Sequence, residues 1–217
     1  MASRAADAPF RSGRKRGALA ILKATEQLMG QHGLDGVSIR QINLAAGMAN
    51  NSAVTYHFGD KTGLLRAVLE WRRPALVEAA RVEFDRVEAA GQLHDPGALF
   101  GIMMRPYLSV LDDEGRHSHA AFMQHIVRSR EGRNLRVAMS HADDCALRAI
   151  DLLRQTLPEL PSQLLSFRLR IATVAFFDAL IEWDRGPVDP KFPQYTLEDL
   201  VQEMIGMAAA NFARPAA

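Results

Sequence analysis

The chain has 217 residues, a formal net charge of +1, and 48% hydrophobic residues. That length allows a sizeable core, and because no apolar run approaches the ~20 residues that a membrane-spanning helix needs, we exclude an integral membrane protein. A single cysteine, Cys145, excludes an internal disulfide and favours a reducing compartment. The N-terminus has no apolar stretch behind its charges, so we expect no signal peptide and a cytoplasmic location.

Charge is distributed unevenly along the chain. Residues 1–75 contain 11 Lys or Arg against 5 Asp or Glu, whereas residues 76–217 contain 15 against 20. A basic first third joined to an acidic remainder is typical of a phosphate-binding module on a body that does not bind nucleic acid. An unevenly charged, solvated surface is the alternative interpretation.

The first residues lack any hydrophobic periodicity. Residues 1–13 mix Ala, Arg, Ser, Pro and Gly, which predicts a flexible arm. The basic cluster that follows either contacts phosphates or a minor groove, or forms a solvated tail; it consists of Arg11, Arg14, Lys15 and Arg16. Apolar residues then recur at helical spacing over residues 16–32, and Gly33 is predicted to end this helix.

Two short helices joined by a tight turn are predicted over residues 38–58. Ser38 and Gln41 have the spacing of a capping box, and Gly47 can adopt the left-handed conformation that ends a helix. The next helix is predicted to be capped by the polar run Asn50, Asn51 and Ser52. It would bury Ala53, Val54 and Phe58 and leave a polar face of Asn51, Thr55, Tyr56 and His57. This arrangement is that of a helix-turn-helix.

The stretch resembles the DNA-binding region of TetR-family transcriptional regulators. The match runs from about Arg16 to Arg73, and its most specific part is the pattern Tyr-His-Phe-x-x-Lys-x-x-Leu that begins at Tyr56. The chain departs from the family pattern at Asn43, where a small residue is usual. The turn before Tyr56 is also one residue longer than usual, with the extra residue at positions 49–51.

The resemblance implies a set of DNA contacts. Lys61 stands in the first turn of a helix, where the helix dipole disfavours a cation, so a nearby phosphate explains it better than solvent does. We expect phosphate contacts from Ser38, Arg40, Tyr56, His57 and Lys61, and base contacts from Asn50, Asn51, Ser52 and Thr55.

The remaining chain also shows helical periodicity, and no stretch alternates with period two, which predicts an all-α fold. Asp60 is expected to cap a helix that Pro74 closes or kinks, and Thr196 with Asp199 to cap the last helix. Further helices are expected over residues 75–92, 98–111, 118–129, 134–157 and 162–185. The predicted domains are a flexible basic arm (1–15), a three-helix helix-turn-helix domain (16–60) and a larger ligand-binding and dimerisation domain (61–217).

The segment 162–185 is apolar nearly all round, and the last helix carries a wide apolar stripe. A dimer through the last two helices, which the resemblance also implies, would bury both; an intramolecular core is the alternative. The resemblance further implies a pocket for a small apolar or aromatic effector, with ordinary core packing as the alternative for each residue. The candidate pocket residues are Met103, Met104, Tyr107, Phe122, Met123, Ile126, His141, Arg148, Phe177, Asp178 and Trp183.

Two other classes of protein compete with a regulator. A helical protein-interaction module without DNA binding would not need the capping and phosphate pattern around Ser38 and Lys61. A metal-dependent helical enzyme would need converging ligands, but His117 and His119 would point to different faces of a helix. No Gly-rich phosphate loop or nucleophile motif occurs either. We therefore expect a dimeric, DNA-binding and ligand-responsive repressor of a near-palindromic operator, with no catalytic residue, no metal and no cofactor.

Overall fold

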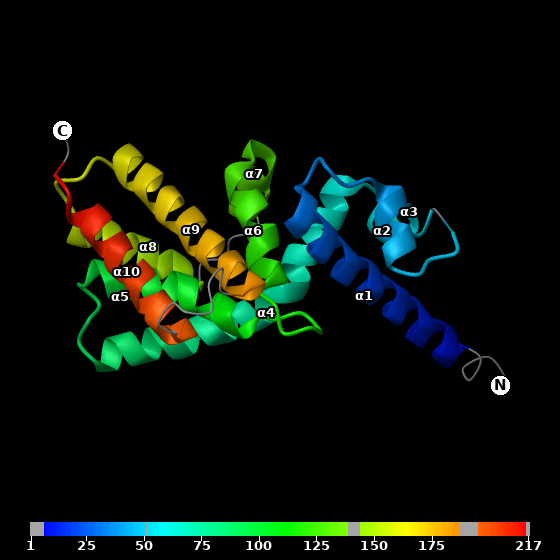
Figure 1. The fold of residues 1–217 in the computed structure, drawn as a ribbon, viewed down its shortest axis with the longest axis horizontal. Helices are drawn as coiled ribbons and strands as arrows, with labels where there is room; N and C mark the ends of the chain where they lie inside the picture. The colour runs from blue at the N-terminus through cyan, green and yellow to red at the C-terminus, as the bar shows by residue number, and fades with distance from the viewer. Residues whose placement is uncertain (1–6, 51, 139–143, 187–194, 216–217) are drawn as a thin grey trace. The chain divides into compact units, whose positions relative to one another are not determined.

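The computed structural model describes residues 7–50, 52–138, 144–186 and 195–215, with the side chains of residues 7–15 and 136–138 left out. These ranges contain helices and no strand, so the expected all-α class is confirmed. The chain divides into two compact units, Met1–Arg72 and Arg73–Ala217 (Figure 1). The predicted boundary after residue 60 separates a DNA-binding part from a ligand-binding and dimerisation part. This assignment of functions stays a prediction.

The N-terminal unit contains α1 (Asp7–His32), α2 (Ile39–Ala45), α3 (Ala53–Phe58) and the first part of α4 (Lys61–Ala89). The first three helices pack on one another around a shared core. Apolar residues at helical spacing on all four helices supply that core, which includes Ile21, Met29, Ile42, Val54, Leu64, Leu65 and Val68. Two short helices are therefore supported by two long ones, as a helix-turn-helix requires.

Helix α1 begins at Asp7, nine residues earlier than the predicted start at Arg16. The expected flexible arm over residues 1–13 is therefore wrong for residues 7–13. Pro9 lies in the first turn, where a missing backbone N–H costs no helical hydrogen bond. The alanine, arginine and lysine residues that follow favour helix strongly enough to outweigh Gly13.

Pro74 lies inside α4 and does not end it, because the helix continues to Ala89. The expected helix start at residue 75 is thus wrong. A proline within a helix removes the hydrogen bond to the carbonyl four residues earlier, here that of Glu70. Both Pro74 and Glu70 are exposed, so water can solvate this carbonyl and the helix tolerates the proline.

The C-terminal unit also contains α5 (Pro96–Met104), α6 (Ser118–Arg128), α7 (Arg130–Ala138), α8 (Cys145–Thr156), α9 (Ser162–Arg185) and α10 (Leu197–Ala213). Seven of the nine residues of α5 are buried, because α8 and α10 both pack against it. In Figure 1, α9 and α10 (yellow-orange and red) lie side by side, and α6 packs on α9. The predicted bounds of α9 are confirmed.

Two predicted helices of this unit are interrupted. The helix expected over residues 98–111 stops at Met104 and continues as a 3-10 helix, η1 (Arg105–Ser109), because Pro106 cannot donate a helical hydrogen bond. The helix expected over residues 134–157 is replaced by α7 and α8, between which residues 139–143 lie outside the described ranges. The side chain of Asp144 caps α8 by accepting a hydrogen bond from the backbone of Ala146 at 2.9 Å.

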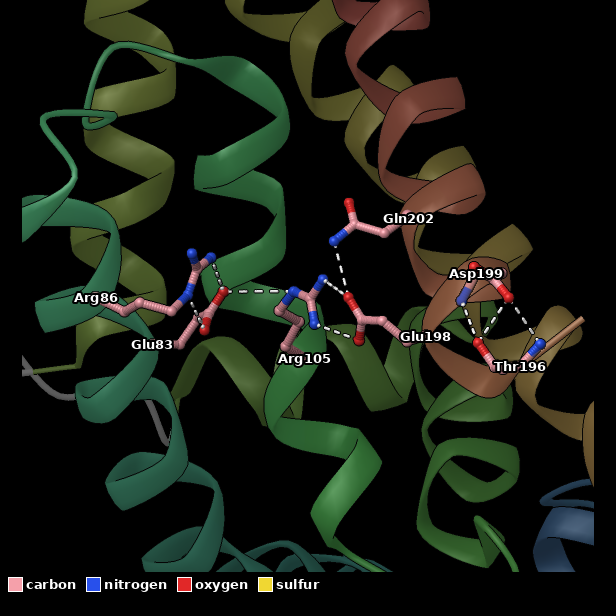
Figure 2. A network of polar contacts seen from close by, with 7 residues as sticks. All are labelled: Glu83, Arg86, Arg105, Thr196, Glu198, Asp199 and Gln202. Atoms are coloured by element: carbon pink, nitrogen blue, oxygen red, sulfur yellow. Dashed lines mark hydrogen bonds and ion pairs between the residues drawn. The ribbon is translucent and has the colours of Figure 1, made fainter.

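Polar contacts connect three helical segments of the C-terminal unit (Figure 2). Arg105 at the start of η1 donates to both carboxylate oxygens of Glu198 on α10, at 3.0 and 2.6 Å, and its Nε lies 3.4 Å from Glu83 on α4. The hydrogen bond from Arg105 lowers the pKa of Glu198 to about 2. Close to this network, the predicted capping box of Thr196 and Asp199 is confirmed.

A second polar contact holds the end of α10. The guanidinium of Arg168, buried on α9, donates to the carbonyl oxygens of Phe212 (3.2 Å), Arg214 and Pro215 (3.1 Å). These carbonyls lie at the end of α10 and just beyond it, so a cation from α9 satisfies groups that a helix C-terminus leaves unpaired. Across the described ranges, no helix is both long enough and apolar enough to cross a bilayer.

Candidate nucleic-acid interface

The start of α2 is fixed by a capping box. The Ser38 hydroxyl accepts a hydrogen bond from the backbone N–H of Gln41 at 3.3 Å, and the Gln41 side-chain oxygen accepts from the backbone N–H of Ser38 at 2.9 Å. This capping box, predicted from the sequence, is confirmed. Ser38 and Arg40 are exposed, so both predicted phosphate-contacting side chains can be reached from solvent.

A left-handed turn at Gly47 separates α2 from the residues before α3. Its φ of 66° is a conformation that side chains disfavour, as the sequence prediction required. The backbone N–H groups of Gly47 and Met48 donate to Leu44 and Asn43, at 3.0 and 2.9 Å. These bonds satisfy carbonyls at the end of α2 and turn the chain sharply.

Helix α3 is capped by a side chain from α2. The side-chain oxygen of Asn43 accepts a hydrogen bond from the backbone N–H of Val54 at 3.2 Å, and both residues are fully buried. Ser52, the N-cap residue by position, makes no capping hydrogen bond with its side chain. The predicted cap is thus wrong for Ser52, and Asn50 accepts instead from the Ser52 backbone N–H at 2.9 Å. Asn51, the third residue of that prediction, lies outside the described residues. The departure at Asn43 therefore has a structural role.

Asn43→Ala is expected to destabilise the N-terminal unit by about 1 kcal/mol, the usual loss for a missing helix cap. The reason is that the Val54 N–H stays buried without its acceptor. Urea unfolding followed by circular dichroism measures the change. Asn50→Ala, at an exposed position, is the control and should change stability by less than half as much.

The predicted polar face of α3 is exposed at Thr55 and Tyr56. Val54 is fully buried, whereas Thr55 is exposed and Tyr56 keeps 64% of its surface accessible. His57 is only half-buried, and a Cβ at Gly17 would lie 4.0 Å from its Nε2, so the imidazole lies beside α1. Asn50 and Ser52 are exposed as well, while Asn51 lies outside the described residues.

Lys61 is the first residue of α4, next to this face in the chain. The carboxylate of Asp60 accepts a hydrogen bond from the backbone of Gly63 at 2.7 Å, as expected of a capping residue. The Lys61 ammonium lies 2.9 Å from the carboxylate of Asp35, which belongs to the loop between α1 and α2. Sequence reasoning missed Asp35 because the two residues are 26 positions apart.

The candidate pocket residues fall into two groups. The apolar ones are buried in the C-terminal unit, where Tyr107 and Phe177 meet edge to face with ring centroids 4.8 Å apart; this group comprises Met103, Met104, Tyr107, Phe122, Met123, Ile126 and Phe177. The polar ones and the tryptophan are exposed, namely Arg148, Asp178 and Trp183. His141 lies outside the described residues. Arg148 stacks its guanidinium on the ring of Phe84, 4.3 Å from the centroid.

Two buried histidines lie near the candidate pocket residues of the C-terminal unit, where the sequence did not predict them. The His117 ring nitrogen Nδ1 lies 2.7 Å from Asp184, whose other oxygen accepts from the His117 backbone at 2.6 Å. His119 is buried and stacks on Tyr107, with ring centroids 5.8 Å apart. No local pattern could have revealed the first pair, because 67 positions separate its members.

Two family models match the chain. The model "Bacterial regulatory proteins, tetR family" matches residues 21–68. The model "Tetracyclin repressor-like, C-terminal domain" matches residues 102–211, and this second match alone covers just over half of the chain. The chain belongs to the TetR family. The first match contains every predicted DNA-contacting residue, from Ser38 to Lys61, and the second contains every candidate pocket residue, from Met103 to Trp183.

One solved structure agrees with the TetR-family assignment at the level of the fold, and two others align less closely. A TetR family transcription regulator from Marinobacter aquaeolei VT8 aligns with 19% identity and a TM-score of 0.57, over 93% of this chain and 97% of that one. The TetR family regulator PfmR from Thermus thermophilus aligns with 18% identity and a TM-score of 0.46, over 91% and 95%. AibR, in complex with isovaleryl coenzyme A and operator DNA, aligns with 18% identity and a TM-score of 0.44, over 88% and 97%. The search of curated proteins gave no match.

Metal-ligand residue types do not converge in the described part of this TetR-family chain. No three His, Cys, Asp or Glu residues there lie close enough together to hold a metal ion. His117 and His119, which were candidate ligands from the sequence, contact the Asp184 carboxylate and the Tyr107 ring, respectively.

Proposed function

We propose that this TetR-family protein is a dimeric, DNA-binding transcriptional repressor whose operator binding is released by a small molecule. The main support for the proposal is that the polar face of α3 is accessible on a helix held firmly in place. Val54 fixes that helix in the core, Asn43 caps it, and Thr55 and Tyr56 are left accessible. Short polar side chains on a rigid helix suit contacts to base edges and phosphates in a major groove.

Accessible apolar side chains on α9 and α10 support the dimer. Phe167 and Ile171 are spaced four residues apart on α9 and are 51% and 49% exposed, while Met207 on α10 is 56% exposed. Exposed apolar groups on neighbouring helices favour an interface, and a two-fold interface would pair this surface with itself. Two copies of α3 would then read the half-sites of a near-palindromic operator.

The effector is proposed to bind among the buried apolar and aromatic residues of the C-terminal unit, such as Met103, Met123 and Phe177. It would release DNA if it favours a dimer whose reading helices are wrongly spaced. Mass spectrometry of compounds that co-purify with the protein would identify its class. A cytoplasmic location belongs to the same proposal.

Tyr56→Ala and Lys61→Ala are each expected to weaken binding to short duplex DNA about tenfold, which corresponds to about 1.4 kcal/mol. Lys61→Ala should also reduce the steepness of the salt dependence by about 0.9 in the log–log plot, because one phosphate contact is lost, whereas Tyr56→Ala should leave it unchanged. Fluorescence anisotropy across a range of salt concentrations measures both quantities.

Arg185→Ala, at an exposed position at the end of α9, is the matched control because it removes the same charge as Lys61→Ala. It should bind DNA nearly as well as the unaltered protein. Sedimentation equilibrium should show a dimer for all three variants. Loss of the dimer in Tyr56→Ala or Lys61→Ala, or salt-independent binding by the unaltered protein, would refute the assignment.

A further inference from the structure

The loop between α1 and α2 passes close to the end of α1. Gly33, with a φ of 82°, ends α1, and a Cβ at Gly36 would lie only 2.2 Å from the carbonyl oxygen of His32. Between these glycines, Leu34 is buried, and Val37 is buried directly after them. Buried side chains thus anchor the loop on both sides of Asp35, whose own side chain is left fully accessible to solvent.

This loop presents a carboxylate to the predicted phosphate-contacting lysine. Oδ1 of Asp35 lies 2.9 Å from Nζ of Lys61, whose side chain is 37% exposed. Ion pairs this accessible contribute little to folding stability, because water solvates both partners well. Stability therefore gives no strong reason for an acidic residue at this position.

We infer that Asp35 lowers the affinity for DNA by pairing with Lys61, an effect called here the electrostatic brake. The inference rests on the proposed phosphate contact of that lysine. In the unbound protein the carboxylate holds the ammonium. A phosphate that binds Lys61 must displace this carboxylate or tolerate a second negative charge about 3 Å from the shared cation. Because the pair is exposed, the displacement is easy, so Asp35 lowers affinity without preventing binding.

Asp35→Asn tests the brake, because asparagine keeps the shape of the side chain and removes its charge. Affinity for a short duplex of random sequence, measured by fluorescence anisotropy at low salt, is expected to rise about two- to fivefold. The gain should shrink as salt is added, because salt screens exposed charges. Glu70→Gln is the matched control: it removes one exposed negative charge from the same unit, roughly 14 Å further along α4 than Lys61. It should raise affinity less than Asp35→Asn does.

The same substitution in a Lys61→Ala background shows whether the brake acts through the lysine. There, the gain from Asp35→Asn should fall to that of Glu70→Gln. An undiminished gain in this background, an equal gain from Glu70→Gln, or no gain in the otherwise unaltered protein would overturn the inference. If Lys61→Ala still weakens binding in that last case, the proposed function stands and the inference alone fails. If the unaltered protein shows no salt-dependent DNA binding, both fail.

Discussion

Replacing Arg72 by methionine is expected to destabilise the N-terminal unit by about 3–5 kcal/mol, because the carboxylate of Glu26 would remain in the core without its cation. Arg72 donates to both oxygens of Glu26, at 2.9 and 2.5 Å, and the two side chains are only 15% and 2% exposed. The guanidinium also lies 4.0 Å from the centre of the Trp71 ring. A loss of this size is a large fraction of the stability of a typical domain.

Urea unfolding followed by circular dichroism measures the effect. Arg66→Met, on the exposed side of the same helix, is the control and should stay within about 0.5 kcal/mol of the unaltered protein. The double variant Glu26→Leu with Arg72→Met should recover most of the loss, since apolar residues often replace both members of a buried ion pair at little cost. A double variant as unstable as Arg72→Met alone would contradict the explanation by an unpaired charge.

The second large effect is expected at Asp112, which organises the loop before α6. Its carboxylate accepts hydrogen bonds from the Ser118 hydroxyl at 2.5 Å and from the backbones of Glu114 and Arg116 at 2.9 and 3.0 Å. Burial raises the pKa of Asp112, but these hydrogen bonds and the charge of Arg116 together outweigh it and lower the pKa from 3.8 to about 2. Asp112→Asn is therefore expected to cost roughly 2 kcal/mol at neutral pH.

This loss should depend on pH in a defined direction. Because the pKa of Asp112 is lower in the folded than in the unfolded chain, its contribution to stability is complete above about pH 4 and disappears as the pH falls towards 2. The difference between Asp112→Asn and the unaltered protein should thus narrow over that interval. Urea unfolding at pH 2 to 7 measures this difference in stability. The pKa of Glu198 is also lowered, but its effect on stability is the same in both proteins and drops out of the difference. A difference that stays constant with pH would contradict an origin in ionisation.

Features that depend on residues close in sequence could be predicted. The capping boxes at Ser38 and Thr196 and the left-handed turn at Gly47 each involve residues at most five positions apart, and all three are confirmed. The cap of α3 could not be predicted, because Asn43 lies eleven positions before its partner Val54. The pairs Glu26–Arg72 and Asp35–Lys61, at separations of 46 and 26, were missed for the same reason.

Proline illustrates how local sequence can leave a prediction open. Pro74 and Pro106 both follow helical stretches, yet α4 continues through the first and α5 gives way to a 3-10 helix just before the second. Pro74 is exposed, whereas Pro106 is buried. The surroundings that decide whether a helix tolerates a proline come from the tertiary structure, which composition and spacing do not describe.

The dependence of α3 on Asn43 has a consequence for how the polar face of α3 forms. At six residues, α3 is far shorter than the roughly 12–15 residues at which an isolated helix becomes even marginally stable in water. As an isolated peptide, α3 would therefore not be helical, and we expect it to become ordered only together with α2. A local opening that unfolds α2 would remove this support, so we expect α2 and α3 to unfold as one cooperative unit.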